Sequence, residues 1–139
     1  MTTPPLLEIP VRSIEELTAR WTYLLEPPEF GARALWLTWI DDDGLMLPLV
    51  VPVDDIPLVP DREMLRGLLG LHDTVAADHL AGEGHLAMAL CRPGRPAITE
   101  DDEEWADALA ALLGDGQIDG TWSLHLAAGG SVTPLAGRR

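Results

Sequence analysis

The segment from Ala89 to Asp102, A-L-C-R-P-G-R-P-A-I-T-E-D-D, constrains the fold of this chain more than any other part of the sequence. It follows an apolar run from His85 to Leu90 and precedes residues with apolar side chains at helical spacing. Gly and Pro within such a segment are typical of a turn, and Thr99 is a preferred residue at a helix start. The sequence therefore predicts a strand, a sharp turn and a helix in direct succession.

The other strands are predicted from the pattern of apolar residues. Both faces of the segment Ala34 to Ile40 are apolar, which favours a strand with two buried faces inside a layered α/β domain. The segment Leu45 to Val53 follows the turn Asp41-Asp-Asp-Gly44 and contains Pro48 and Pro52. Prolines cannot donate ladder hydrogen bonds, so this strand is expected at an edge or beside a bulge. Two further strands are predicted at 85–91 and 121–127, and the turn at Gly129-Gly130 leaves room for one more short strand.

Apolar residues that recur every three or four positions predict three helices, near 14–25, 62–80 and 100–113. Ser13 and Glu16 have the spacing of a capping box at the start of the first helix, and Asp61 is suited to cap the second. Gly67 and Gly70 weaken the second helix by about 1 kcal/mol each, unless a close neighbour needs their small size.

The order of these elements defines the fold class. A helix, two strands, a helix, a strand, a helix and a strand predict an α/β sandwich with a central mixed sheet flanked by helices. With 139 residues and 47% hydrophobic residues, the chain is expected to form a single α/β domain around one core. Residues 1–29 are expected to be an N-terminal helical addition, 30–135 the core of the domain and 136–139 a frayed tail.

The turn from Ala89 to Asp102 resembles the metal-binding turn of the JAB/MPN metalloprotease family, in particular of its RadC-like branch. That turn reads H-x-H-P-S-G-x-P-x-P-S-x-x-D, and its glycine, second proline, second serine and aspartate correspond to Gly94, Pro96, Thr99 and Asp102. The order of strands and helices over residues 30–135 is also similar to that of the family. The resemblance implies a JAB/MPN (RadC-like) sandwich.

The two metal-binding histidines of the family fall on Ala89 and Cys91. Ala89 cannot coordinate a metal, so Cys91 and Asp102 remain as two candidate ligands where a catalytic zinc site needs three. The resemblance therefore implies a scaffold without its metal chemistry, with no catalytic residue and no cofactor. The alternative is a divergent metal-dependent hydrolase, of peptidase or isopeptidase type, that takes a further ligand such as His72 or Glu29.

Both candidate ligands also have structural explanations. Cys91 at a strand end is typical of a small buried hydrophobic residue. Asp102 fits the third helical position of a capping box. The whole run Glu100-Asp-Asp-Glu-Glu104 places acids at the positive end of a helix, with Arg92 and Arg95 as local counter-charges.

Charge and hydropathy limit the kinds of partner. Against 23 acidic residues the chain has nine arginines and no lysine, for a net charge of −14. Such a chain repels phosphate groups, so neither nucleic acid nor an anionic membrane is expected as a partner. The apolar runs are too short to span a bilayer, and the N-terminus lacks the pattern of a secretory signal. A cytoplasmic protein is expected, and the absence of lysine beside abundant Ala, Leu and Gly is typical of a GC-rich bacterial genome.

These observations predict a domain that recognises another protein, with a basic protein among the candidate partners, or assembles with itself. The predicted interaction surface is the turn and the acidic helix start that follows it, comprising Arg92, Arg95, Glu100, Asp101, Glu103 and Glu104. Five tryptophans are candidate interface anchors, although Trp21 and Trp105 are expected in the core. The strand segment from Trp36 to Trp39 is the second candidate surface.

Overall fold

Five strands form one mixed sheet in the order β2-β1-β3-β4-β5. The bounds of the strands are β1 (Ala34–Ile40), β2 (Met46–Asp54), β3 (His85–Cys91), β4 (Thr121–Ala128) and β5 (Ser131–Arg138). The parallel pair is β3 with β4, and the other neighbours are antiparallel. The structure is a computed structural model that describes residues 9–80, 84–114 and 120–138.

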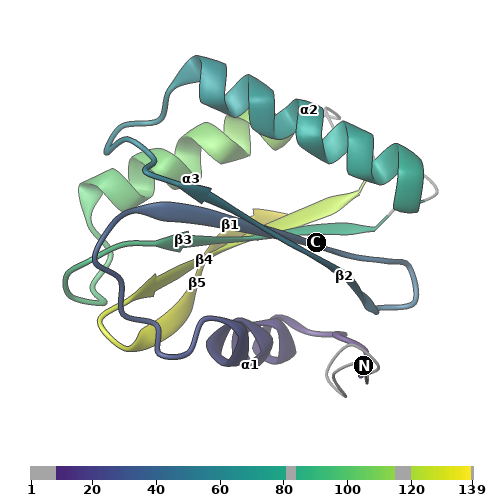
Figure 1. Ribbon diagram of the computed structural model, residues 1–139, viewed down its shortest axis with the longest axis horizontal. Coiled ribbons are helices and arrows are strands. Elements are labelled where there is room, and N and C mark those ends of the chain that lie inside the picture. The colour runs from purple at the N-terminus through teal and green to yellow at the C-terminus, as the bar shows by residue number, and fades with distance from the viewer. Residues whose placement is uncertain (1–8, 81–83, 115–119, 139) are drawn as a thin grey trace.

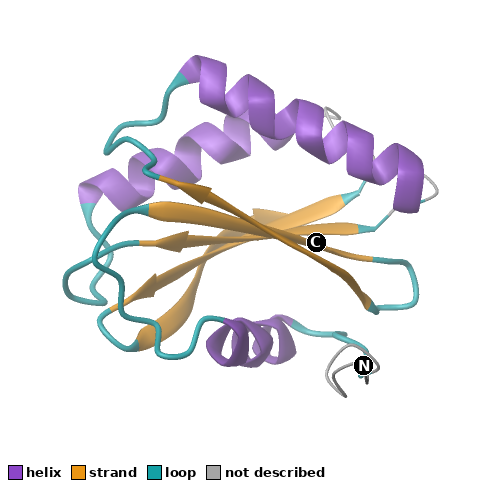
Figure 2. Cartoon of the chain, in the orientation of Figure 1, coloured by secondary structure: helices purple, strands orange, loops and turns teal. Residues whose placement is uncertain are grey.

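Helices cover both faces of this sheet (Figure 1). Their bounds are α1 (Ile14–Leu24), α2 (Arg62–His79) and α3 (Glu100–Leu113). α1 lies on one face, while α2 and α3 lie side by side on the other, so the domain has three layers (Figure 2). Among the described residues, no helix combines the length and the apolar character needed to cross a membrane.

The sequence predicted the mixed sheet and its flanking helices correctly. Each of the seven predicted elements agrees with the structure to within one residue at either end, and β3 lies in the interior of the sheet as expected. The predicted tail at 136–139 was wrong for residues 136–138. They continue β5, because Ala136, Gly137 and Arg138 pair with β4 opposite Leu124, Ser123 and Trp122. Arg139 lies outside the described residues, as does the first part of the helical addition, residues 1–8.

The alternation along β1 and β3 divides the core into two clusters. Leu35, Leu37 and Trp39 of β1 pack toward α2 and α3, where Trp105 is also fully buried. Trp21 of α1 is fully buried on the other face. There it belongs to a cluster in which β3 contributes small side chains, Ala87, Ala89 and Cys91. The small side chains leave room for the indole ring between the helix and the sheet.

The helix starts follow the caps that the sequence predicted, with one difference. The side chain of Ser13 accepts a hydrogen bond from the backbone N–H of Glu16, but the Glu16 carboxylate accepts from the N–H of Arg12 instead of completing the box at Ser13. In α2, a Cβ built at Gly67 or Gly70 meets nothing within 4 Å. Packing therefore gives no reason for these two glycines.

β2 is an edge strand, as its prolines predicted, and pairs with β1 alone among the described strands. Pro52 lies opposite Trp36, and Pro48 and Pro52 share the same strand parity. The carbonyl of Leu49, at the other parity, points toward β1 and accepts from the Thr38 hydroxyl at 2.9 Å. The Pro52 nitrogen therefore faces the open edge, and Pro48 lies where the register with β1 shifts, between Met46 and Val50. The two prolines remove two of the donors that an added strand would need.

Replacing both prolines tests this reading of the edge. The variant Pro48→Thr with Pro52→Thr restores two N–H donors in residues that favour strands. We expect the variant to associate further as its concentration rises, whereas the association state of the wild type does not change over the same concentrations. Analytical ultracentrifugation measures both. The matched control is Pro57→Thr, an exposed proline outside the strands. Equal association of the wild type and the double variant would contradict this role of the prolines.

Candidate functional site

The turn between β3 and α3 is built around a buried arginine. Arg92 is 4% exposed, and its Nε and Nη2 atoms each donate to the Asp102 carboxylate at 2.8 Å. Its remaining N–H groups donate to the backbone carbonyls of Pro93, Arg95 and Ala97. All five N–H groups of the guanidinium are therefore satisfied inside the turn. This burial corrects the prediction that Arg92 contributes to an exposed interaction surface.

Asp102 closes the same turn from the helix side. Its Oδ2 accepts from the backbone N–H of Thr99 at 2.9 Å, and its own N–H donates to the Thr99 hydroxyl at 3.2 Å, which confirms the capping box. Burial alone raises the pKa of the Asp102 carboxyl, but the hydrogen bonds from Arg92 and Thr99 outweigh it, so the pKa lies below its usual range. Asp102 is thus a fixed carboxylate whose lone pairs are engaged within the turn.

Cys91, the other candidate metal ligand, lies on the opposite side of the sheet. Its side chain is fully buried in the cluster beneath α1, whereas α3, which carries Asp102, packs through Trp105 and Leu109 into the cluster on the other face. Burial raises the pKa of the Cys91 thiol to about 12. Since zinc binds the thiolate, neither the placement nor the protonation of Cys91 suits a site shared with Asp102.

The further ligands considered for a metal site lie elsewhere. His72 is buried in α2, where its Nδ1 atom accepts from the indole N–H of Trp39 at 3.1 Å. Glu29 is exposed in the segment between α1 and β1. Among the described residues, no group of three or more His, Cys, Asp or Glu side chains is placed to hold one metal ion.

The rest of the predicted interaction surface lies at the start of α3. Arg95, Glu100, Glu103 and Glu104 are exposed, and Asp101 is partly exposed. These five residues are therefore accessible, and their part in binding stays a prediction.

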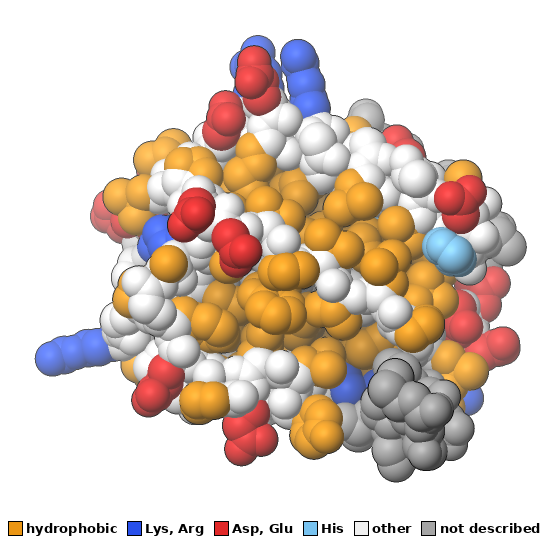
Figure 3. Space-filling view, viewed as in Figure 1, with side chains coloured by type: hydrophobic (Ala, Val, Ile, Leu, Met, Phe, Trp, Pro, Cys, Tyr) orange, Lys and Arg blue, Asp and Glu red, His pale blue; other side chains and the backbone are white. Residues whose placement is uncertain are grey.

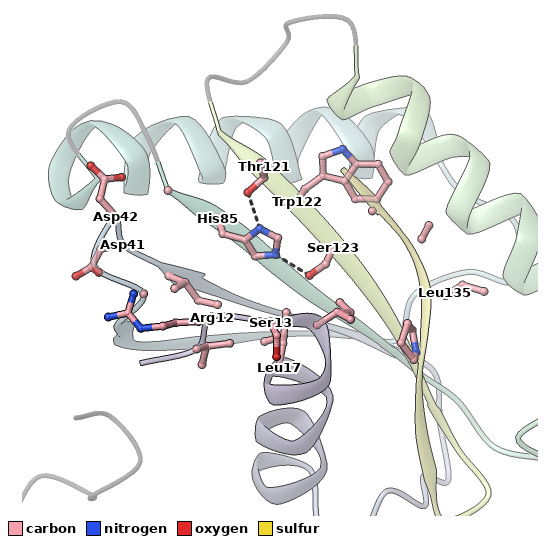
Figure 4. A pocket seen from close by; sticks show the side chains of 18 residues that line it. Arg12, Ser13, Leu17, Asp41, Asp42, His85, Thr121, Trp122, Ser123 and Leu135 are labelled. Carbon is pink, nitrogen blue, oxygen red and sulfur yellow. Dashed lines mark hydrogen bonds between the residues drawn. The ribbon is translucent and has the colours of Figure 1, made fainter. Parts of the chain in front are cut away.

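A pocket of about 690 Å³ lies elsewhere, on the α1 side of the sheet where β3 and β4 begin (Figure 4). The start of α1 forms one wall, with Arg12 and Ser13, and the β1–β2 turn contributes Asp41 and Asp42. The apolar part of the lining includes Val11, Ile14, Leu17, Ile40 and Leu135. The pocket therefore combines apolar walls with a few polar groups, as ligand sites commonly do.

Three polar side chains meet at the sheet surface of this pocket. His85 is the first residue of β3, and its ring lies between two hydroxyl groups from β4 (Figure 4). The Nδ1 atom is 2.7 Å from Thr121 Oγ1, and the Nε2 atom is 2.8 Å from Ser123 Oγ. Parallel pairing makes this possible, because His85 lies opposite Thr121 and Ala87 lies opposite Ser123.

The sequence analysis did not identify this group, although one signal was present. Thr121, Ser123 and His125 alternate with apolar residues, which places three polar side chains on one face of β4. His125 is fully buried, and its Nε2 atom is 2.8 Å from the Thr18 hydroxyl. The hydroxyl partners of His85 lie 36 and 38 residues away in sequence, so no local pattern indicates them.

Apolar side chains also gather on the surface around β2, which we name the β2 edge surface (Figure 3). It comprises the exposed or partly exposed residues Trp36, Leu47, Pro48, Leu49, Val50, Val51, Pro52 and Val53. Leu49 and its odd-numbered neighbours pack on the cluster beneath α2, while Val50 and the prolines lie on the opposite side of the strand.

Comparisons of the chain with protein-family models, with curated proteins and with solved structures found no match.

The Arg92–Asp102 pair is expected to dominate the stability of the turn. Asp102→Ala leaves a buried guanidinium without its counter-charge, and we expect a loss of about 3–5 kcal/mol in the free energy of unfolding, measured by urea denaturation. The matched control is Asp101→Ala, in the same helical turn but partly exposed, with an expected change within about 0.5 kcal/mol.

Acid titration gives a second measure of the pair. Because the pKa of Asp102 is lower in the folded chain than in the unfolded one, its stabilising contribution is complete above about pH 4 and is lost as the pH falls toward the folded value. Asp102→Asn should lack this part of the acid dependence. If the acid transition of that variant is the same as that of the wild type, the Asp102 carboxylate does not contribute to the pH dependence of the free energy of unfolding.

The metal hypothesis has its own test. Protein purified without chelator should contain far less than one equivalent of zinc, and EDTA should leave its melting temperature unchanged, because Cys91 and Asp102 lie on opposite sides of the sheet. Metal content is measured by mass spectrometry. Stoichiometric zinc that is lost in Cys91→Ala would instead support the divergent hydrolase.

Proposed function

We propose that this protein is an interaction module that binds a basic protein partner through the β2 edge surface. The observation that carries the proposal is the set of exposed and partly exposed apolar side chains along one edge strand (Figure 3). A contiguous apolar patch on a monomer is typical of a protein contact site. Trp36, which is partly exposed opposite Pro52, is the residue type most often found as an interface anchor.

The partner docks on side chains rather than adding a strand to the sheet. Pro48 and Pro52 leave the open edge short of donors, so a row of main-chain hydrogen bonds is not available as the source of affinity. Val50, Pro48 and Pro52 instead present apolar area on the side of the strand that lies away from α2. A helix or loop with apolar side chains fits such a surface.

The negative charge around β2 favours a basic partner. Residues 41–61, which contain β2 and its two flanking segments, include six aspartates and no basic residue. A second copy of this chain would bring the same aspartates and a further net charge of −14 to the contact. Repulsion disfavours that pairing, whereas a basic partner is attracted and correctly oriented.

The start of α3, favoured by the sequence, is the alternative docking surface. It offers exposed carboxylates at Glu100, Glu103 and Glu104, with Ile98 as a neighbouring exposed apolar side chain. Exposed charges contribute mainly to the association rate and little to affinity. The β2 edge surface is favoured because it adds apolar area to an acidic surround.

A RadC-like JAB/MPN scaffold without its metal chemistry is the finer part of the proposal. Its support is the turn, in which Gly94 adopts a φ of 99° and Thr99 and Asp102 form the helix cap, at positions that match the motif. Ala89 and Cys91 stand where the family has metal-binding histidines. The turn would then have kept the residues that shape it and lost those that bind metal.

A peptide titration followed by NMR tests the docking surface. The probe is a synthetic amphipathic peptide of leucine and lysine, and the acidic leucine–glutamate peptide is its counterpart. We expect the basic peptide to shift the amide signals of Leu49, Val50 and Val51, and salt to weaken its binding. Val50→Glu should raise Kd about tenfold or more, because it places a charge in the apolar contact.

The control is Thr133→Glu, which adds the same charge at an exposed position of β5 on the opposite edge of the sheet. Its Kd should stay within about twofold of the wild type. Shifts confined to residues 100–104, and loss of binding in Glu103→Lys with Glu104→Lys but not in Val50→Glu, would move the docking surface to α3. Equal binding of both peptides would exclude a role for charge.

A further inference from the structure

The hydroxyl–imidazole–hydroxyl group in the pocket has the geometry of an activated nucleophile. Ser123 Oγ lies 2.8 Å from His85 Nε2, and Thr121 Oγ1 lies 2.7 Å from Nδ1 on the other side of the ring. In the tautomer with its proton on Nδ1, His85 donates to Thr121 and accepts from Ser123. A serine held by a base, with the base oriented by a third group, is the arrangement on which serine nucleophiles depend.

Burial and access are both suitable for such a pair. Ser123 is 2% exposed, yet it lines the pocket together with His85 and Thr121. Ser123 is therefore almost entirely shielded from bulk water and forms part of the pocket wall. A cavity of about 690 Å³ is within the size range of small-molecule sites.

The start of α1 supplies groups suited to a developing negative charge. Ser13, at the start of α1, lines the same pocket as His85 and Ser123 (Figure 4). The N–H of Glu16 is bonded to the Ser13 side chain and the N–H of Leu17 to its carbonyl. The N–H groups of Ile14 and Glu15 come before the first intrahelical donor, so they point out of the helix start. Because the start of α1 lines the same pocket as Ser123, it is the wall of the pocket suited to stabilise an oxyanion.

We propose that Ser123 and His85 hydrolyse small uncharged esters in this pocket, an activity that does not depend on the β2 edge surface. Ser123 Oγ bonds to the acyl carbon and its proton moves to His85 Nε2. The ester C–O bond then breaks, and the alcohol leaves with that proton. Water next attacks the acyl carbon and gives a proton to His85. The acyl–Oγ bond breaks and Oγ takes the proton back, which releases the acid.

The lining of the pocket sets the class of substrate. Its walls are apolar at Val11, Ile14, Leu17 and Leu135, which favours a short acyl chain. Asp41 and Asp42 at the β1–β2 turn disfavour an anionic substrate by repulsion. Thr121 is a positioning residue, because it acts on the ring of His85 rather than on the ester.

Two probes test the nucleophile, a fluorophosphonate for covalent labelling and p-nitrophenyl butyrate for turnover. We expect the wild type to be labelled, with mass spectrometry locating the adduct on Ser123. Ser123→Ala and His85→Asn should each lose labelling and reduce ester hydrolysis about 100-fold or more, to the rate of the buffer. The control is Ser131→Ala, a serine of β5 outside the pocket lining, with labelling and turnover unchanged.

Thr121 is tested by its effect on the base. Thr121→Val should lower kcat more than it changes KM and should move the pH profile of turnover, whereas Thr121→Ser should restore both. A wild type that is not labelled, an adduct on another residue, or hydrolysis that survives Ser123→Ala would overturn the proposal. Because the adduct is located in the wild type, this result stands even if a variant fails to fold.

Discussion

The contact between Arg92 and Asp102 holds the strand–turn–helix unit together. A buried ion pair stabilises a fold when its geometry is complete and each remaining donor finds an acceptor. Here the guanidinium makes a two-pronged contact with the carboxylate and also donates to three carbonyls of the turn. The end of the central strand β3 is thereby tied to the start of α3. The same contact occupies the residue that a metal site at this turn would require.

Local patterns in the sequence were sufficient for most of the fold, and long-range pairing accounts for the rest. Helical and strand periodicity located seven elements, because packing follows the apolar face that each pattern defines. Pro134 and Gly137 disfavour a strand, yet pairing along β4 outweighs this preference and continues β5 to Arg138. Arg92 was expected at the surface, as a counter-charge to the acidic run from Glu100 to Glu104, because arginine rarely lies inside a protein. Nothing local to Arg92 indicates that its side chain turns inward to meet Asp102.

The group formed by His85, Thr121 and Ser123 in the pocket shows more clearly that local sequence patterns do not indicate long-range contacts. Sequence alternation places Thr121 and Ser123 on one face of β4, but it does not say which strand lies beside them. Parallel pairing with β3 aligns His85 with Thr121 and brings the imidazole ring between two hydroxyls. The two candidate metal ligands show the reverse case, in which residues close in sequence are separated in the structure. Cys91 and Asp102 are close in sequence, yet the strand parity of β3 and the position of α3 place them on different sides of the sheet.

The two faces of the sheet explain why a binding surface and a pocket coexist in so small a domain. α2 and α3 cover one face, while the shorter α1 packs mainly against β5 on the other. Small side chains in β3 admit Trp21 beneath α1, and the helix begins at the amino ends of β3 and β4, where His85 and Ser123 line the hollow. β2 lies at the far edge from β5, so its apolar residues remain open to a partner. A single short helix, set to one side of the sheet, therefore leaves both features accessible.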